Sequence, residues 1–229
     1  MDPSYRALVG GLAPLQNLTP PALDALLADA TWQRLEEGEE VFGQGEPALY
    51  FYMLVQGRAK VVQTTPEGQQ VVLVIVGPGE FFGLAAGIGR TTYPGTATAV
   101  MPGAALSWPS AIWERLVSIH PDIARDAMLT MGRRLQEMQA RLREMSTERV
   151  ERRIAHAILR LVRQSGRKVD AGVMIEFPIS RQDIAEMTGT TLHTVSRTLS
   201  AWEQSGILVG VRRRIIVRDA HALVRIAGD

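Results

Sequence analysis

Residues 179–197, ISRQDIAEMTGTTLHTVSR, carry the sharpest structural signal in this chain. Ser180 followed three residues later by Asp183 matches a variant of the capping box, a pattern that starts a helix. Gly189 allows a left-handed turn after this helix, and either of the two threonines that follow can cap a second helix. The stretch therefore predicts two short helices joined by a tight turn, a helix-turn-helix.

The second predicted helix has one apolar and one polar face. Val195, Leu199 and Trp202 recur at helical spacing and predict the buried face. The polar side chains on the opposite face are His193, Ser196, Arg197 and Ser200. Such groups suit base edges in a major groove, because an arginine can bind guanine O6 and N7 together. This face predicts DNA contact, with Arg197 as the leading base reader.

An arginine-rich hairpin is expected after the second helix. Gly206 ends that helix, and Ile207–Val211 and Arg214–Arg218 form two predicted strands. The tip of the hairpin carries Arg212, Arg213 and Arg214. These like charges repel one another in the free protein but release counterions beside phosphates. Either element alone has a plain structural explanation, helix packing or a solvated loop, whereas the two in sequence favour a winged helix-turn-helix.

The segment 121–146 predicts a long helix that pairs with a second copy of the chain. Its apolar residues alternate in steps of four and three over three heptads: Ala124, Met128, Met131, Leu135, Met138, Leu142 and Met145. Charges on the remaining faces leave a narrow stripe, which suits a partner helix. The alternative is that this helix only packs on the N-terminal domain. A hinge is expected at Ser146–Thr147, before a new helix that begins with Val150.

The first 120 residues predict a helix followed by short antiparallel strands. The helix is expected within Leu12–Thr31, with Thr19 as its cap and Pro20 and Pro21 in its first turn. The expected strands are Glu40–Phe42, Leu49–Val55, Arg58–Thr64, Gln69–Val76, Phe81–Phe82 and Gly95–Val100. Pro66-Glu67-Gly68 predicts a hairpin turn. Short strands between regular glycine turns predict a small barrel or roll.

Composition narrows the class of protein. The 229 residues carry a net charge of +1 and no cysteine, which excludes disulfides and cysteine-ligated zinc or iron–sulfur sites. No catalytic or metal-binding motif occurs, so we expect no enzyme and no metal. No signal peptide or long apolar run is present, which predicts a cytoplasmic protein without a membrane partner. We expect an α+β chain with domains at 1–120, 121–146 and 147–229.

This region order resembles the cyclic AMP receptor protein and fumarate-nitrate reductase regulator (Crp/Fnr) family over roughly residues 15–225. The matching stretches include GEEVFGQGE at 38–46, GEFFG at 79–83, RQDIA at 181–185, TVSR at 194–197 and GIL at 206–208. The resemblance implies a jelly-roll type β-roll like that of cyclic-nucleotide-binding domains, a dimerisation helix and a winged helix-turn-helix. It implies a homodimeric transcription regulator that binds palindromic promoter DNA and contacts RNA polymerase.

The resemblance also implies which residues touch DNA. Base contacts fall on Leu192, His193, Ser196 and Arg197. Backbone contacts implied by the resemblance are Arg181, Gln182, Thr191 and Thr194. To this backbone set we add Ser180, Thr190 and the arginines at the tip of the hairpin, Arg212, Arg213 and Arg214. Ser196-Arg197 is similar to the oxygen- and nitric-oxide-responsive branches of the family, which often have glutamate in place of His193. The target sequence therefore stays open.

The effector is a separate question. Cyclic nucleotide binders of the family have a glutamate where this chain has Leu84 and an arginine near Pro94, so the resemblance disfavours cyclic AMP. Arg90 as a substitute for that arginine, and haem bound through His120, stay as alternatives. The expected effector pocket comprises Phe82, Gly83, Leu84, Ala85, Gly95, Thr96 and Met138. A β-roll module without DNA specificity is the alternative from another functional class.

Overall fold

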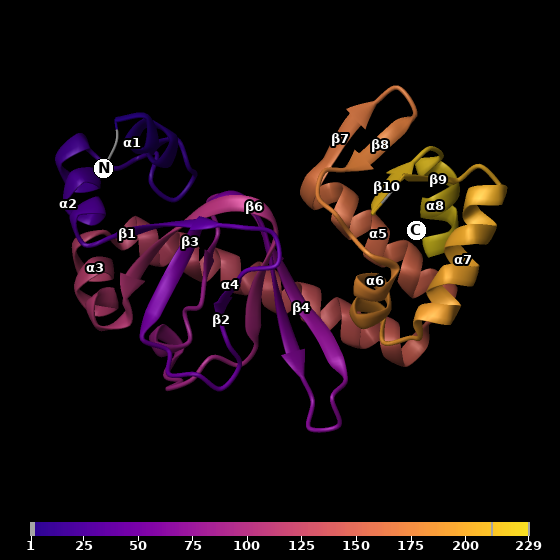
Figure 1. Ribbon diagram of the computed structural model, residues 1–229, viewed down its shortest axis with the longest axis horizontal. Helices are drawn as coiled ribbons and strands as arrows, with labels where there is room; N and C mark the ends of the chain where they lie inside the picture. Colours follow the sequence, from indigo (N-terminus) through magenta and orange to yellow (C-terminus); the bar gives the residue numbers. More distant parts are fainter. Residues whose placement is uncertain (1–2, 212, 229) are drawn as a thin grey trace. The chain divides into compact units, whose positions relative to one another are not determined.

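The computed structural model describes residues 3–211 and 213–228. These residues form two compact units, whose elements are labelled in Figure 1. The first unit comprises residues up to Gln69 together with Leu73–Leu135. The second comprises Gln70–Val72 and the residues from Gln136 onward. Within the described residues, no helix is both long enough and apolar enough to cross a membrane.

The first unit begins with two helices, α1 (Pro3–Gly10) and α2 (Pro20–Ala28). Pro20 and Pro21 occupy the first turn of α2, as predicted, because proline lacks only an N–H that this turn leaves unbonded. Thr19 stands at the cap position but its side chain makes no capping hydrogen bond. The short helix expected within Leu12–Thr31 is thus confirmed as α2, whereas α1 was not expected.

A six-stranded sheet follows. Its strands are β1 (Thr31–Leu35), β2 (Glu40–Phe42), β3 (Tyr50–Thr64), β4 (Gln70–Val76), β5 (Phe81–Phe82) and β6 (Thr96–Pro109). The strand order is β1-β6-β3-β4, with β2 on β6 and β5 on β3. β3 and β4 flank the predicted hairpin turn, where Gly68 has φ +81°. The roll is thus confirmed, although β1 was not expected.

Two strands were predicted where β3 is one. The break was expected at Gln56–Gly57, but Gly57, with φ +86°, lies in an irregularity of the β3–β6 pairing and not in a turn. A Cβ at Gly57 would lie 2.9 Å from the carbonyl oxygen of Pro102, so glycine serves close backbone approach. β6 likewise continues to Pro109, past the expected end at Val100, because it pairs along β3 and β1.

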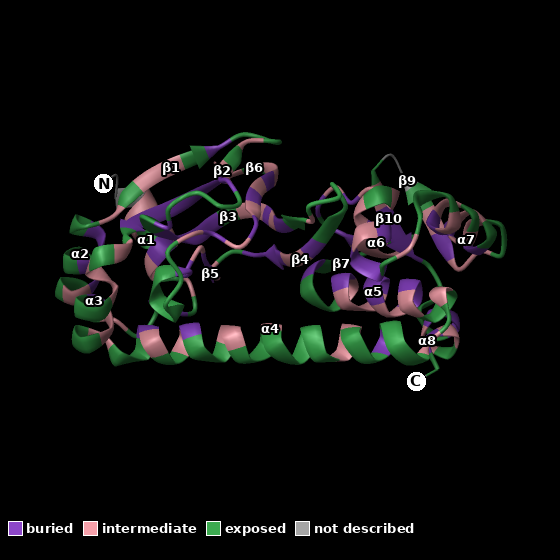
Figure 2. Ribbon diagram, turned by 90° about the horizontal axis from the view of Figure 1, so that it is seen from below, coloured by how far each residue is buried: buried purple, intermediate pink, exposed green. Residues whose placement is uncertain are grey.

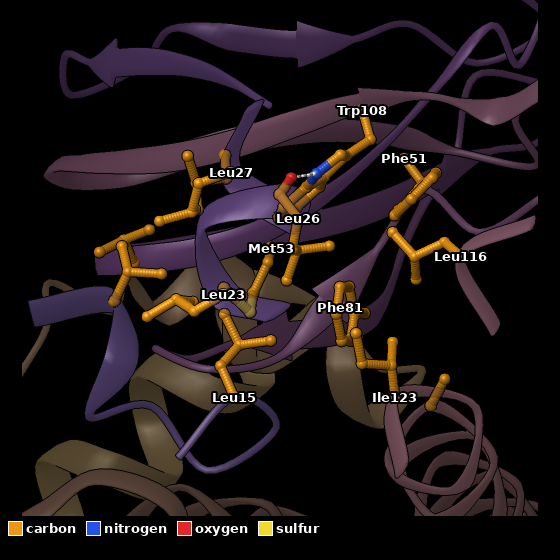
Figure 3. Close-up of a cluster of buried hydrophobic side chains, with 14 of the residues drawn as sticks. Leu15, Leu23, Leu26, Leu27, Phe51, Met53, Phe81, Trp108, Leu116 and Ile123 are labelled. Atoms are coloured by element: carbon orange, nitrogen blue, oxygen red, sulfur yellow. Dashed lines mark hydrogen bonds between the residues drawn. The ribbon is translucent and has the colours of Figure 1, made fainter. Parts of the chain in front are cut away.

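Alternate residues of the sheet enter two separate cores. Phe51, Met53 and Trp108 pack in the first, together with residues of α2 and later helices. Figure 3 shows this cluster, in which the Trp108 indole N–H donates to the carbonyl oxygen of Leu26 at 3.0 Å. Tyr52 and Leu54 point the other way, into the second core inside the roll. The period of two along β3 therefore divides the hydrophobic side chains between the two faces of the sheet.

Helices and single helical turns complete this part of the chain. They are η1 (Ala86–Ile88), η2 (Ser110–Ile112), α3 (Trp113–Ile119) and α4 (Pro121–Thr147). Ile123 and Ala127, at the start of α4, are buried in the first core. Most of the remaining length of α4 is exposed (Figure 2).

The second unit continues after α4 with further helices and a four-stranded sheet. The elements are α5 (Val150–Ser165), β7 (Gly166–Val169), β8 (Gly172–Ile175), α6 (Arg181–Thr188), α7 (Leu192–Gln204), β9 (Leu208–Val211), β10 (Arg214–Val217) and α8 (Ala220–Ala227). The strand order is β7-β8-β10-β9, so the predicted wing hairpin is extended by β7 and β8, which were not expected. The predicted fold class is confirmed.

The expected hinge is displaced. Ser146 and Thr147 still belong to α4, and their hydroxyls donate to the carbonyl oxygens of Leu142 and Arg143, each at 2.8 Å. The chain leaves helical structure between Thr147 and Val150. The hydroxyls bond within the helix they were expected to interrupt.

Candidate DNA-binding surface and effector domain

The turn between α6 and α7 is built by local hydrogen bonds. Ser180 Oγ accepts from the Asp183 amide at 3.0 Å, and the Asp183 carboxylate accepts from the Ser180 amide at 2.8 Å. This is the reciprocal capping box that the sequence predicts. Gly189 ends α6 with φ +59°, and Thr191 caps α7 by accepting from the Thr194 amide at 3.2 Å.

Helix α7 presents the expected polar face to solvent. Val195, Leu199 and Trp202 are buried, as predicted. His193 and Arg197 are exposed, Ser196 is half-buried, and the Leu192 side chain is 48% exposed. The four residues predicted to face bases therefore share the accessible side of one rigid helix.

Several residues predicted to touch the DNA backbone have partners inside the chain. Thr191 and Thr194 hydroxyls lie 3.0 Å apart, and Gln182 Nε2 donates to Glu186 at 2.8 Å. Ser180 is engaged in the capping box, and Thr190 is half-buried. The Arg181 guanidinium binds the Glu203 carboxylate. The Ser180 and Thr191 bonds lie at the starts of α6 and α7, whereas Glu203 lies in the last turn of α7.

The wing turn is held against the entry to α6. The Ile179 amide donates to the carbonyl oxygen of Arg213 at 2.9 Å. Arg213 has φ +57°, a left-handed conformation in which a non-glycine residue is uncommon. Arg214 lies at the start of β10. Arg212, predicted with them, lies outside the described residues.

The predicted stripe on α4 divides into two parts. Ala124 and Met131 are half-buried, and Met131 packs against the first core of its own chain. The exposed members of the stripe are Met128 at 74%, Leu135 at 53%, Met138 at 49%, Leu142 at 67% and Met145 at 53%. The apolar stripe therefore packs on the N-terminal domain only at the start of α4. Farther along the helix, Arg134 and Arg141 donate to the carbonyl oxygens of Phe81 and Val72, each at 2.9 Å.

The residues expected to line an effector pocket do not line a single cavity. Phe82 and Ala85 belong to the core inside the roll, whereas Leu84 belongs to the core that α4 joins. A Cβ at Gly83 would lie 3.0 Å from the Tyr52 ring, and one at Gly95 would lie 2.7 Å from the Val62 carbonyl oxygen. Met138, in the second unit, is exposed, and Thr96 Oγ1 accepts from the Gln44 amide at 3.0 Å.

Stacked aromatic rings occupy the inside of the roll. The ring centroids of Phe42 and Tyr93 are 3.9 Å apart, and those of Tyr52 and Phe82 are 5.2 Å apart. The Tyr93 hydroxyl donates to the Tyr50 carbonyl oxygen at 2.7 Å. Burial raises the pKa of Tyr52 and of Tyr93 above the usual tyrosine value, so both stay neutral. The aromatic rings make the interior of the roll apolar, and Tyr52 and Tyr93 each add one hydroxyl group to it.

Two other residues were considered as possible effector ligands, Arg90 for a cyclic nucleotide phosphate and His120 for haem. Arg90 is exposed after η1, and His120 is half-buried at the end of α3. Over 3–211 and 213–228, no three His, Asp or Glu side chains are grouped so that they could hold a metal ion.

Comparison with known families agrees with both halves of the chain. The description "Cyclic nucleotide-binding domain" matches residues 32–120, and "Crp-like helix-turn-helix domain" matches residues 152–226. The chain belongs to the Crp/Fnr family of transcriptional regulators. Crp/Fnr proteins are DNA-binding transcription factors and not enzymes, and they bind DNA as homodimers.

Individual relatives come from several branches of the Crp/Fnr family. The cyclic AMP receptor protein of Thermus thermophilus is 29% identical over 210 residues, 92% of this chain and 94% of that protein. The nitrogen fixation regulation protein FixK of Azorhizobium caulinodans is 29% identical over 189 residues, 82% of this chain and 75% of that protein. The FixK2 structure from Bradyrhizobium japonicum has a TM-score of 0.74 at 26% identity, covering 86% of this chain and 96% of that chain.

A cluster of ionisable residues in the second unit was not predicted from the sequence. Glu144 and Arg160 form a buried ion pair at 2.5 Å, and His156 Nε2 lies 3.2 Å from a carboxylate oxygen of Glu148. The two acids are four residues apart on one segment and the two bases four apart on the next, the only signal of the pairing in the sequence. Arg153 donates to the carbonyl oxygen of Thr188 at 3.0 Å and so joins α5 to the helix-turn-helix.

Proposed function

We propose that two copies of this chain pair along α4 and insert their two α7 helices into successive major grooves of a palindromic promoter site. The observation that carries this proposal is the exposed face of α7, where donors suited to base edges stand on a rigid helix. Leu192, His193, Ser196 and Arg197 would face bases. The backbone set would be Ser180, Arg181, Gln182, Thr190, Thr191, Thr194, Arg213 and Arg214, with Arg212 assigned from sequence alone.

The dimer seam would lie on the exposed part of α4. Met128, Leu135 and Leu142 are spaced by seven residues, as are Met138 and Met145. This spacing is that of the a and d positions of a two-stranded coiled coil, and a partner helix would remove these side chains from water. The domains would then be a sensor at 1–120, a dimer helix at 121–146 and a DNA-binding domain at 147–229.

The effector of the β-roll is proposed not to be cyclic AMP. Leu84 offers no acceptor for a ribose hydroxyl, and it packs in the core outside the roll interior. Pro94 offers no charge for a phosphate, and stacked aromatic rings occupy the interior. With Ser196-Arg197 on α7, these features favour a place nearer the Fnr-like branches than the cyclic AMP binders.

A cyclic AMP response is the second candidate, because a relative of 29% identity is named a cyclic AMP receptor protein and Arg90 is exposed near the roll. Titration calorimetry of the purified protein with cyclic AMP separates the two: our proposal expects no binding heat at millimolar nucleotide. A Soret band in protein from haem-supplemented cells would instead indicate haem, with His120 as the candidate ligand.

The decisive test of DNA binding is genome-wide chromatin capture followed by footprinting of the recovered sites. We expect palindromic promoter sites whose half-sites are about one helical turn apart.

Arg197→Ala should weaken binding by about 1 to 3 kcal/mol and relax specificity at one base pair. Replacing the wing arginines by alanine should weaken all duplexes and flatten the salt dependence. Equal affinity of wild type for every duplex would favour the β-roll module without DNA specificity.

The remaining partners follow from this proposal. A regulator bound at promoters in the cytoplasm would contact RNA polymerase, and a small-molecule effector would act through the β-roll. Recovery of polymerase subunits with promoter-bound protein tests the first of these contacts.

A further inference from the structure

In the absence of DNA, Arg181 is paired with a carboxylate of its own chain, that of Glu203. Its Nη2 lies 3.2 and 3.3 Å from the two carboxylate oxygens of Glu203. Its Nη1 donates to the Ser196 carbonyl oxygen and to Ser200 Oγ, each at 3.3 Å. The guanidinium of α6 is therefore held by α7 at several points.

The Glu203 carboxylate stands where three elements meet. It reaches Arg181 of α6, and a Cβ at Gly210 of β9 would lie 2.5 Å from Glu203 Oε1. The same residues line an open hollow of about 410 Å³ between the helix-turn-helix and the wing, together with Arg213 and Arg214. Glu203 thus places an anion among three arginines on a surface that we assign to the DNA backbone.

We propose that Glu203 is an internal phosphate mimic, which occupies Arg181 in the free protein and gives it up to a DNA phosphate. A carboxylate and a phosphate offer a guanidinium the same pair of charged oxygens, so one can replace the other without moving the arginine. The Arg181 and Glu203 side chains are 38% and 33% exposed, so a phosphate can reach them.

The consequence concerns non-specific binding. While Glu203 holds Arg181, a DNA phosphate gains less binding energy from this arginine. The phosphate must first displace the carboxylate, which then remains beside it as a like charge. Glu203 would lower the affinity for DNA of any sequence and reduce its salt dependence, leaving discrimination to the base-facing residues of α7. This inference rests on the proposed DNA interface, since it assigns Arg181 to the backbone.

The test compares full-length wild type, Glu203→Gln, Arg181→Gln and the double variant on a duplex of random sequence, by fluorescence anisotropy at several salt concentrations. Glu203→Gln should bind about three- to ten-fold more tightly near 0.1 M salt, with the slope of log affinity against log salt steeper by about 0.9. Arg181→Gln should lose about ten-fold or more, because it leaves the carboxylate facing phosphate. The double variant should recover most of that loss.

Glu176→Gln is the matched control, because Glu176 pairs with Arg167 at the same 3.2 Å distance but lies outside the hollow. It should leave affinity and slope unchanged. If Glu203 only staples α6 to α7, Glu203→Gln will lower the unfolding midpoint without tightening DNA binding, and the double variant will show no recovery. Either result overturns the proposal, whereas a wild type that binds no duplex contradicts the proposed function itself.

Discussion

Gly189 occupies a position where both the backbone and the available space select glycine. Its φ is +59°, and a Cβ there would lie 2.9 Å from Met145 Cε. The methionine can shift, but the left-handed conformation remains unfavourable for any residue with a Cβ. The turn of the helix-turn-helix therefore depends on one residue that makes no side-chain contact.

We expect Gly189→Ala to lower the free energy of unfolding by about 1 to 2 kcal/mol. Denaturant unfolding measures this change. Gly132→Ala is the control, since Gly132 lies in α4, a Cβ there would have nothing within 4 Å, and alanine favours the helix. The two substitutions should shift stability in opposite directions, and a stabilising Gly189→Ala would contradict the argument.

Tyr52 links stability to alkaline pH. Burial, followed by the neighbouring Tyr93, raises the pKa of its hydroxyl in the folded protein. The folded state thus holds this proton more tightly than the unfolded state, so the stabilisation is complete below the unfolded pKa of about 10 and is lost as pH rises above it. Unfolding free energies measured across the alkaline range should fall above about pH 10. Tyr52→Phe should show a shallower fall; an identical curve would exclude this role of Tyr52.

At the scale of elements, the corner between α4 and α5 is stabilised by charge. Glu144 and Arg160 form an ion pair and are nearly buried, with side chains 8% and 16% exposed. One helical turn away, His156 Nε2 lies 3.2 Å from a carboxylate oxygen of Glu148. Burial also lowers the pKa of Arg141, which donates to the Val72 carbonyl oxygen at 2.9 Å. These contacts make the end of α4 continuous with the DNA-binding domain.

Removing one member of the buried pair leaves the other charge without its partner. Glu144→Ala should therefore lower the free energy of unfolding by about 3 kcal/mol. Thermal and denaturant unfolding should agree on this loss. Glu176→Ala, which breaks an exposed pair, should stay within about 0.5 kcal/mol of wild type. Equal effects of the two variants would show that burial of the Glu144–Arg160 pair is energetically unimportant.

At the scale of the whole molecule, function depends on how two chains associate. The exposed stripe of α4 is the surface we assign to that association, and a charge placed in it would have to be buried beside an apolar partner. Leu142→Glu should give monomers at micromolar concentration and remove most of the affinity for a palindromic site. Sedimentation velocity and anisotropy on the footprinted site measure the two effects.

Leu129→Glu supplies the control for this experiment. Leu129 is 54% exposed on the same helix but lies outside the seven-residue repeat, so this variant should remain dimeric and bind DNA as wild type does. A dimeric Leu142→Glu protein would place the seam elsewhere.

Elements that depend on near neighbours in the chain could be predicted from the sequence. The capping box, the left-handed glycine and the buried face of α7 each involve residues at most a few positions apart, and all three are present as predicted. The hairpin turn at Gly68 is of the same kind. Local hydrogen bonds and backbone preferences act over such distances whatever the rest of the chain does.

Contacts between segments that are distant in the chain could not be predicted in this way. Gly57 serves a close approach to Pro102 and not a turn, β6 continues because two strands pair with it, and Leu84 and Phe82 face different cores. The partners of Arg181 and Glu144 lie 22 and 16 residues away in the chain. Such contacts depend on which surfaces folding brings together. The matched four-residue spacing of the two acids and the two bases is the only sign of the Glu144 pairing in the sequence, and it does not by itself specify the partner.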